Sequence, residues 1–249
     1  MNIIVPLAGE GKRFIEAGFP EKPFVDINGE PLIRRVIESL PSGWQGCKFY
    51  FVTRKEYFDR IDKLTENMGL SRTVLSLENT TEGAACTALQ VKKHLSIPEL
   101  SEPLLIVNGD QIVKFSLLNF NTIANLLLSN GNEVAGLIPV FKAAGPKWSY
   151  VKLDSYNRVT YVAEKKPVSI WATCGIYFWS KGEAFFDCAE NMIENERRVN
   201  NEYYIAPVYN EILKYKFIPG TVLALEVEEM ISLGTPEDVQ DWLLNGDWE

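Results

Sequence analysis

The sequence predicts an α/β fold in which helices flank a mainly parallel, mixed sheet. Three observations lead to this class. In the first half of the chain, short apolar runs alternate with amphipathic segments, which is typical of parallel strands joined by helical crossovers. A loop rich in glycine follows the first apolar run, at residues 8–11, where open α/β sheets bind ligands. In the second half, a turn signal at residues 154–157 indicates a hairpin and an α+β arrangement.

The elements of the first half follow from hydrophobic periodicity. Short, continuously apolar runs are typical of strands that are buried on both faces. In segment 31–40, apolar residues recur at helical spacing on one face, and Pro31 suits a first turn. The predicted strands cover residues 2–7, 49–52, 73–77 and 103–107, and the predicted helices cover 31–40, 55–67, 83–94 and 117–129.

The pattern changes after about Pro139. Repeats and low-complexity tracts are absent from the sequence, so we expect a single domain over residues 1–249 with halves of about 1–139 and about 140–249. The elements predicted in the second half are hairpin strands at 150–153 and 159–163, strands at 174–179 and 217–227, helices at 181–194 and 202–215, and a short helix after Pro236.

Composition excludes several classes of protein. The chain has 249 residues, of which 46% are hydrophobic, enough to fill a large core. Its formal net charge of −8 argues against nucleic acid or an anionic membrane as a partner. No apolar run approaches the length of about 18 residues that spans a bilayer. The four cysteines are scattered without a CxxC pair, so we expect reduced thiols and a cytoplasmic protein.

The loop after the first predicted strand is a candidate phosphate-binding site. Gly9 and Gly11 allow backbone N–H groups to approach a phosphate closely, and Lys12 and Arg13 add positive charge. The alternative is an ordinary turn with basic residues in solvent. The GxxxxGK[ST] motif is absent, and Phe14 stands at the third glycine position of GxGxxG, which disfavours a hydride-transfer enzyme.

A candidate metal ligand follows the apolar strand at 103–107. Asn108-Gly109-Asp110 lies at the same predicted sheet edge as the glycine loop. Mg²⁺ in proteins takes one or two carboxylates together with phosphate oxygens and waters, so Asp110 is a sufficient start for such a site. The alternative is an Asp in a turn, which is common after strands. The only histidine, His94, follows two lysines at a predicted helix end and is not expected to act as a general base.

Further short motifs occur in a fixed order along the chain. They are Glu21-Lys22-Pro23, Thr81-Glu82-Gly83-Ala84-Ala85, Glu164-Lys165-Lys166-Pro167, Cys174-Gly175-Ile176-Tyr177 and Gly234-Thr235-Pro236-Glu237-Asp238. With the loop at 6–14, they make nearly the whole chain resemble the sugar-1-phosphate nucleotidylyltransferase superfamily. The resemblance implies a Rossmann-like fold of the nucleotide-diphospho-sugar transferase type. It also implies an enzyme that joins an NTP to a phosphorylated small-molecule acceptor, with Mg²⁺ as cofactor and pyrophosphate as the second product.

The same resemblance implies roles for individual residues. Arg13, Lys22 and Asp110 would be catalytic: Arg13 on the triphosphate, Lys22 near the α-phosphate and Asp110 on Mg²⁺. The acceptor would contact Glu164, Lys165 and Gly175, although a charged pair on a strand edge is usually solvated. The nucleotide-binding residues would be Leu7, Ala8, Gly9, Glu10, Gly11, Thr81, Glu82, Gly83 and Asn108.

The chain departs from the family pattern at one position. The family carries a second metal-binding Asp two residues before a Gly-Thr pair, and here that residue is Ser232. Glu228 is the predicted replacement as a metal ligand, with Glu229 as the alternative. An acidic strand end in solvent is an equally good interpretation. A nucleotide sensor without catalytic activity would also fit the loss of this Asp.

Three segments of the second half, 146–150, 164–167 and 198–204, resemble a subgroup associated with capsule and surface polysaccharides. This subgroup includes cytidylyltransferases that use CTP and phosphoglutamine in capsule phosphoramidate synthesis. The resemblance adds Lys147, Trp148, Arg198 and Glu202 as predicted acceptor-binding residues. A sugar-1-phosphate enzyme that makes an NDP-sugar remains the alternative, and a glycosyltransferase is disfavoured because Ile112 replaces the second Asp of a DxD motif. The sequence leaves the subunit number open, and a homo-oligomer is compatible with it.

Overall fold

The computed structural model describes residues 1–41, 44, 46–115, 134–214 and 220–246. The strands of the first half are β1 (Asn2–Leu7), β2 (Asp26–Ile27), β3 (Glu30–Pro31), β4 (Lys48–Arg54), β5 (Arg72–Leu77), β6 (Leu104–Val107) and β7 (Gln111–Lys114). The helices of this half are α1 (Lys12–Glu16), α2 (Leu32–Glu38), α3 (Phe58–Asn67), α4 (Ala84–Leu89) and α5 (Ile97–Leu100).

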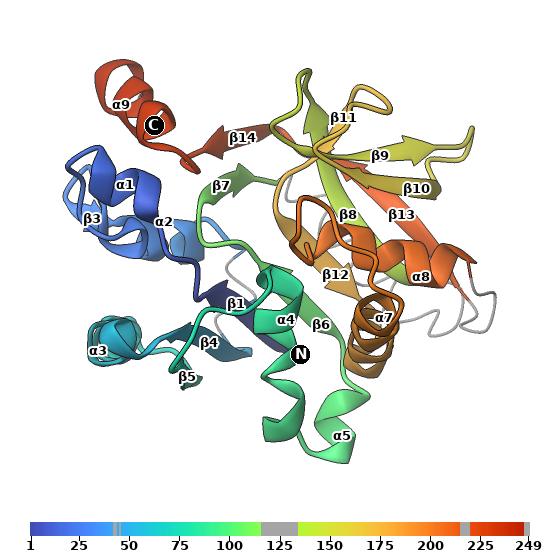
Figure 1. The fold of residues 1–249 in the computed structure, drawn as a ribbon, viewed down its shortest axis with the longest axis horizontal. Helices are drawn as coiled ribbons and strands as arrows, with labels where there is room; N and C mark the ends of the chain where they lie inside the picture. Colours follow the sequence, from blue (N-terminus) through green and yellow to red (C-terminus); the bar gives the residue numbers. More distant parts are fainter. Residues whose placement is uncertain (42–43, 45, 116–133, 215–219, 247–249) are drawn as a thin grey trace.

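The second half continues the same sheet. Its strands are β8 (Val134–Lys142), β9 (Ser149–Leu153), β10 (Val159–Glu164), β11 (Trp171–Thr173), β12 (Ile176–Trp179), β13 (Thr221–Glu226) and β14 (Glu229–Ser232). Its helices are α7 (Gly182–Glu194), α8 (Tyr209–Lys214) and α9 (Pro236–Asn245). β8 crosses the boundary predicted near Pro139, so the two halves share one sheet (Figure 1).

The central sheet is mixed. Its order is β10-β9-β11-β8-β12-β6-β1-β4-β5, and β13 pairs with β8. In the first half β6, β1, β4 and β5 are parallel, whereas β12 joins β6 antiparallel and the strands beyond it pair mostly antiparallel. The α/β class with a mixed sheet is therefore confirmed, and the change of pairing in the second half matches the predicted α+β character.

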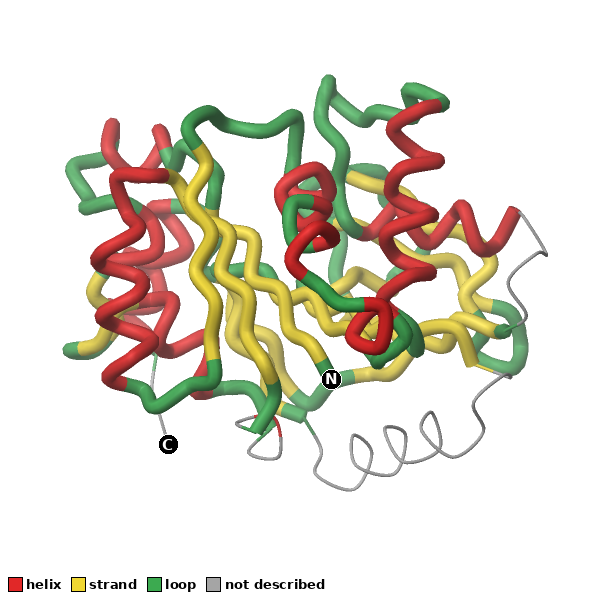
Figure 2. Tube along the Cα trace, turned by 90° about the horizontal axis from the view of Figure 1, so that it is seen from below, coloured by secondary structure: helices red, strands yellow, loops and turns green. Residues whose placement is uncertain are grey.

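Helices cover both faces of the sheet (Figure 2). Side chains alternate across a strand, and in β4 Phe49 and Phe51 enter one core whereas Tyr50 and Val52 enter the other. The first core also contains buried residues of α2, α3 and α9, and the second contains those of α4, α7 and α8. The result is a three-layer arrangement that leaves the strand ends accessible. Among the described residues, no helix has the length and apolar character needed to cross a membrane.

Most predicted elements of the first half are confirmed. β1, β4, β5, β6, α2 and α3 lie where periodicity places them. The predicted helix at 83–94 is shorter, because α4 ends at Leu89 and a 3₁₀ turn follows at Lys92–His94. The helix predicted at 117–129 lies outside the described residues. β7 was not predicted, and it forms a separate ladder with β14 from the far end of the chain.

In the second half, the hairpin β9–β10, α7 and α9 are confirmed. The predicted helix at 202–215 begins only at Tyr209, because Tyr203 is instead hydrogen-bonded through its backbone to Glu82 and Ala85. β13 covers Thr221–Glu226 of the strand predicted at 217–227, and residues 217–219 lie outside the described part.

The strand predicted at 174–179 begins only at Ile176, as β12, and Cys174 and Gly175 separate it from β11, which was not predicted. β11 pairs with β9 and β8, whereas β12 pairs with β6 and β8, so the sheet changes partners at this point. Gly175 has φ of +74°, and a Cβ here would lie 1.4 Å from Gln111 Oε1. The Gly175 carbonyl accepts the Asn108 N–H at 2.8 Å. The break therefore brings the two halves together beside the end of β6.

Candidate active site

A cavity of about 660 Å³ opens at the C-terminal ends of β1 and β6, and both halves of the chain line it. This is the edge at which open α/β sheets bind ligands. The residues contributed by the first half are Pro6, Leu7, Ala8, Gly9, Glu10, Gly11, Lys12, Arg13, Phe14, Lys22, Pro23, Thr80, Thr81, Gly83, Ala84, Thr87, Asn108, Gly109 and Asp110. The second half contributes Glu202, Tyr204 and Gly234.

The glycine loop forms one wall of this cavity. Gly11 has φ of +62° and immediately precedes α1, so the chain turns sharply between β1 and the helix. Arg13 lines the cavity from the first turn of α1. Lys12 forms an ion pair with Glu10 at 2.5 Å, and its side chain is 71% exposed. Lys12 and Arg13 both line the cavity, and the partner of Lys12, Glu10, lines it as well.

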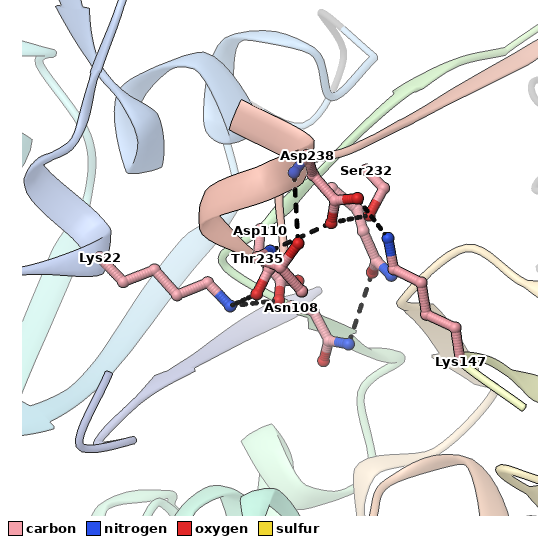
Figure 3. Close-up of polar contacts among 9 residues, drawn as sticks. Lys22, Asn108, Asp110, Lys147, Ser232, Thr235 and Asp238 are labelled. Atoms are coloured by element: carbon pink, nitrogen blue, oxygen red, sulfur yellow. Dashed lines mark hydrogen bonds and ion pairs between the residues drawn. The ribbon is translucent and has the colours of Figure 1, made fainter. Parts of the chain in front are cut away.

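Lys22 and Asp110 meet on another wall of the cavity (Figure 3). Lys22 begins a 3₁₀ turn at Lys22–Phe24, and its Nζ lies 2.6 Å from Asp110 Oδ2 and 3.4 Å from the Gly234 carbonyl oxygen. The other carboxylate oxygen, Asp110 Oδ1, is buried and has no hydrogen-bond partner within the described residues. Buried polar atoms are nearly always satisfied, so an unpaired carboxylate oxygen in a cavity indicates a site for a ligand. A hard divalent cation fits this oxygen donor.

The structure does not bring Glu228 to Asp110. In the β7–β14 ladder, Ser232 pairs with Gln111 and Glu229 with Lys114. Glu228 therefore lies beyond the far end of the ladder, about 14 Å along the strand from Ser232 at about 3.4 Å per residue. Glu229 forms an ion pair with Lys114 at 2.9 Å. The prediction that Glu228 supplies a second metal ligand is corrected by this register.

An acidic side chain without a role in the sequence prediction, Asp238, lies beside Ser232. Ser232 Oγ donates to Asp238 Oδ2 at 3.0 Å, and the Thr235 N–H donates to the same oxygen at 3.0 Å. Lys147 Nζ lies 2.5 Å from Asp238 Oδ1. Burial alone would raise the pKa of Asp238, but the hydrogen bonds from Lys147, Ser232 and Thr235 lower it. The only signal in the sequence was the position of Asp238 at the end of the 234–238 motif.

The loop at 80–85 is fixed by the second half of the chain. The Tyr203 N–H donates to the Glu82 carbonyl at 2.8 Å, and the Ala85 N–H donates to the Tyr203 carbonyl at 3.0 Å. Thr81 lines the cavity with its hydroxyl 2.6 Å from that of Thr87. Glu82 points elsewhere, since its carboxylate pairs with Arg198 at 2.6 Å. Glu82 was predicted to bind the nucleotide and Arg198 the acceptor, and in the structure these two residues contact each other.

We expect Gly83→Ala to destabilise this loop strongly. Gly83 has φ of +132°, and an added Cβ would lie 2.5 Å from the Tyr203 carbonyl oxygen. Strain and overpacking together cost about 2–4 kcal/mol. Chemical denaturation should therefore show reduced stability. Gly69→Ala is the control, because Gly69 also has a positive φ, +70°, but nothing lies within 4 Å of its Cβ position. Equal losses in both variants would contradict a specific clash with Tyr203.

Of the predicted acceptor residues, only Glu202 is among the described residues that line this cavity. Glu202 and Tyr204 line the cavity, and Lys165 Nζ lies 2.5 Å from Tyr204 Oη. Glu164 and Arg198 line a neighbouring cavity of about 340 Å³. Trp148 packs edge-on against Phe141 with ring centroids 5.1 Å apart. Tyr204, Thr80, Thr87 and Gly234 are lining residues without an assigned role in the sequence analysis, and only structure places them here.

Burial raises the pKa of Glu164, and hydrogen bonding from Ser149 and the charge of Lys165 offset this effect only in part. Because the folded-state pKa lies above the unfolded value, the folded protein binds more protons, and stability falls as the pH rises from about 4.5 through the folded pKa. We expect Glu164→Gln to flatten this part of the stability profile. Thermal unfolding of both proteins between pH 4 and 7 measures it, and parallel profiles would contradict the assignment.

Comparison with known proteins gives this geometry a context. The nucleotidyl transferase family matches residues 4–215, which is most of the chain. The chain belongs to this family. It is therefore a nucleotidyltransferase enzyme, and the family implies an NTP and a phosphorylated acceptor as substrates. Among curated proteins, no relative matches the sequence.

Solved structures share the fold of this nucleotidyltransferase. A nucleoside-diphosphate-sugar pyrophosphorylase from Vibrio cholerae RC9 superposes with a TM-score of 0.79 at 23% identity, over 98% of this chain and 100% of that one. An inositol-1-phosphate CTP transferase from T. maritima gives 0.70 at 17% identity, over 95% and 90%. A UDP-glucose pyrophosphorylase complexed with UDP-glucose gives 0.72 at 16% identity, over 96% and 95%. These similarities support the fold.

Proposed function

We propose that this enzyme transfers a nucleotidyl group from an NTP, with CTP favoured, to a small phosphorylated metabolite and releases pyrophosphate. The observation that carries the proposal is Asp110, whose Oδ1 is buried and unpartnered among the described residues, in a cavity that also contains Arg13 and Lys22. A carboxylate beside two cations suits a triphosphate and its divalent cation. We also propose a cytoplasmic location, where the four free cysteines would remain reduced.

The proposed reaction is an in-line displacement. A phosphate oxygen of the acceptor attacks the α-phosphorus of the NTP, the bond between the α-phosphorus and the bridging oxygen breaks, and pyrophosphate leaves with that electron pair. The nucleophile is already an anion, so a general base is not required. Arg13 would hold the triphosphate, Lys22 would offset charge at the α-phosphate, and the walls of the cavity would align the two substrates. Mg²⁺, held by Asp110, would screen the charge that develops on the phosphate oxygens.

The residues proposed to bind the acceptor lie in the second half of the chain. Glu202 and Tyr204 face the cavity, and Lys165 is held at Tyr204. A carboxylate together with a cation suits an acceptor that bears both a phosphate and a hydroxyl or amino group. The sequence motifs of the capsule-associated subgroup favour phosphoglutamine within this class, as a precursor of capsule phosphoramidate. The fold similarity to the enzymes named above supports sugar phosphates and inositol phosphate as alternative acceptors.

Pyrophosphate release with Mg²⁺ tests the proposal. CTP, UTP, dTTP, GTP and ATP should each be paired with sugar 1-phosphates, inositol 1-phosphate, phosphocholine and L-glutamine phosphate. We expect release that requires one NTP and one acceptor, with CTP as the best nucleotide. Release with sugar phosphates alone would replace phosphoglutamine by a sugar acceptor. Nucleotide binding without release for any pair would instead favour a sensor.

A further inference from the structure

One wall of the cavity is uncharged. The described lining residues of segment 80–87 are Thr80, Thr81, Gly83, Ala84 and Thr87. None of them has an ionisable side chain, and Glu82, the acid of this segment, pairs with Arg198 instead. The glycine loop and the wall formed by Lys22 and Asp110 both carry charged side chains. Because phosphates are bound by charged groups and N–H donors, the uncharged wall is the one that suits the base of the nucleotide.

Three oxygen atoms of this wall lie within hydrogen-bond distance of one another. Thr81 Oγ1 and Thr87 Oγ1 are 2.6 Å apart, and the Gly83 carbonyl oxygen lies 3.0 Å from the first and 3.2 Å from the second. We call these three atoms the oxygen cluster. Thr87 lies in α4 and is only 3% exposed, whereas Thr81 is half-buried. Of the two hydroxyl groups, that of Thr81 is therefore the more accessible to a ligand.

The oxygen cluster contains two protons, one on each hydroxyl, and its internal contacts use both. At 2.6 Å one hydroxyl donates to the other, because two facing lone pairs would repel. The hydroxyl that accepts then donates to the Gly83 carbonyl, which is within reach of either threonine. In both possible directions the two protons stay inside the cluster. The oxygen cluster therefore offers hydrogen-bond acceptors, and no hydroxyl proton, to a ligand.

A group of acceptors discriminates among the bases. Cytosine and adenine carry an exocyclic amino group, which donates, whereas thymine, uracil and guanine carry a carbonyl oxygen there, which accepts. The ring N–H of uracil can also donate, but it lies between two carbonyl oxygens, and these would be repelled by the oxygen cluster. The 4-amino group of cytosine has two N–H bonds and no carbonyl oxygen beside it. The oxygen cluster thus favours an amino-bearing base.

We infer that Thr81 is a specificity-determining residue whose hydroxyl oxygen accepts a hydrogen bond from the exocyclic amino group of the base, which is cytosine in the proposed reaction. Thr87 is a positioning residue, because its hydroxyl keeps the proton of Thr81 from turning toward the ligand. The inference rests on the proposed function, since it places the base of the NTP at segment 80–87. A preference for CTP over UTP then has a physical cause in this wall.

Nucleotide titrations without an acceptor test the inference and require no turnover. The ligands are CTP, UTP and the triphosphate of 2-pyrimidinone riboside, which is CTP with a hydrogen in place of the 4-amino group. Isothermal titration calorimetry with Mg²⁺ measures their dissociation constants. We expect the analogue without the amino group to bind about tenfold more weakly than CTP, because one hydrogen bond is lost. UTP should bind more weakly still, because its 4-carbonyl oxygen would face the oxygen cluster.

Thr81→Val keeps the size of the side chain but removes the accepting oxygen. CTP and the analogue without the amino group should then bind equally, within about twofold. Thr81→Ser retains the hydroxyl and should keep the tenfold ratio. A purely structural role of Thr81 would weaken both ligands alike and leave the ratio unchanged. The control is Thr160→Val, because the Thr160 hydroxyl also donates to a backbone carbonyl, that of Lys152 at 3.2 Å, but is exposed and not among the described lining residues.

Thr87→Val tests the positioning role. Without the Thr87 hydroxyl, the Thr81 hydroxyl can turn its proton toward a ligand, and the Gly83 carbonyl still accepts the Thr87 N–H at 3.1 Å. We expect UTP to bind about fivefold more tightly than to the wild type, because the 4-carbonyl oxygen gains a donor. CTP should bind nearly as before. An unchanged ratio of CTP to UTP affinity would contradict the role of Thr87.

Three outcomes would overturn the assignment of Thr81: a wild type that binds CTP and the analogue without the amino group equally, a wild type that binds UTP as tightly as CTP, or a Thr81→Val variant that keeps the tenfold ratio. Failure of the inference is distinguishable from failure of the proposed function. Pyrophosphate release with UTP as the best nucleotide would support nucleotidyl transfer and overturn the inference. Selective binding of CTP without release for any acceptor would support the inference and contradict the proposed function.

Discussion

Asp110→Asn is expected to lower the rate of pyrophosphate release by at least about 10²–10³, the loss typical for removal of one preorganised group at a developing charge. The substitution keeps the size of the side chain but removes the anion that would hold the divalent cation. It also leaves the Lys22 ammonium, 2.6 Å away, without its counter-ion. Steady-state assays with saturating NTP and Mg²⁺ measure the rate, and Mn²⁺ binding followed by electron paramagnetic resonance should weaken in parallel.

The fold should survive this change. The contact that joins this segment to the strand β14 and its following turn uses the Asp110 backbone carbonyl, which accepts the Leu233 N–H at 2.9 Å. Circular dichroism and thermal unfolding of Asp110→Asn should therefore resemble those of the wild type. A folded Asp110→Asn variant with a normal rate of pyrophosphate release would contradict both the role of Asp110 as a cation ligand and the proposed function.

Lys22→Ala is expected to reduce turnover by a similar factor, at least about 10², because the charge that offsets the α-phosphate is lost. Its effect on the cation should be opposite to that of Asp110→Asn. Lys22 Nζ lies 2.6 Å from Asp110 Oδ2, so its removal should strengthen Mn²⁺ binding in the absence of nucleotide. The two measurements together separate a lysine that acts on the nucleotide from one that only neutralises Asp110.

The matched control for Lys22→Ala is Lys55→Ala. Lys55 is also paired with a carboxylate, Glu78 at 2.8 Å, but its side chain is 66% exposed and it is not among the residues that line the cavity. Exposed ion pairs contribute about 0–1 kcal/mol, so we expect a change in rate of less than about fivefold. If Lys55→Ala impaired turnover as severely as Lys22→Ala, the assignment of the α-phosphate to Lys22 would be wrong.

The C-terminal ends of β1 and β6 were predicted correctly because strands that are buried on both faces consist of continuous apolar residues. The run at 104–107 and the run at 2–7 are separated by most of the first half, yet they pair in parallel. Parallel pairing places Leu7 and Asn108 at one sheet edge, and the residues that follow these runs line one cavity. Local patterns are therefore sufficient to predict that Arg13 and Asp110 lie at the same edge of the sheet.

Local patterns could not predict contacts that depend on register between distant strands. The β7–β14 ladder joins residues 111–114 to 229–232, and its register decides that Ser232 and not Glu228 lies beside Gln111. An acidic residue near the end of an apolar strand carries no information about which end of a ladder it will occupy. Glu228 was chosen incorrectly because this register could not be predicted. The start of α8 at Tyr209 was missed for a similar reason, because it depends on the backbone hydrogen bonds of Tyr203 with Glu82 and Ala85.

Neighbouring residues in the sequence were sufficient to predict the class of fold, the glycine loop and the acid at the end of β6, whereas the role of Lys22 was implied by the resemblance to the family. Only the tertiary structure decided which side chains meet. It paired Glu82 with Arg198, and it placed Asp238 against Ser232 and Lys147. The physical reason is that hydrogen bonds and ion pairs act over about 3–4 Å, and residues that are distant in the chain reach that separation only through the packing of helices and strands.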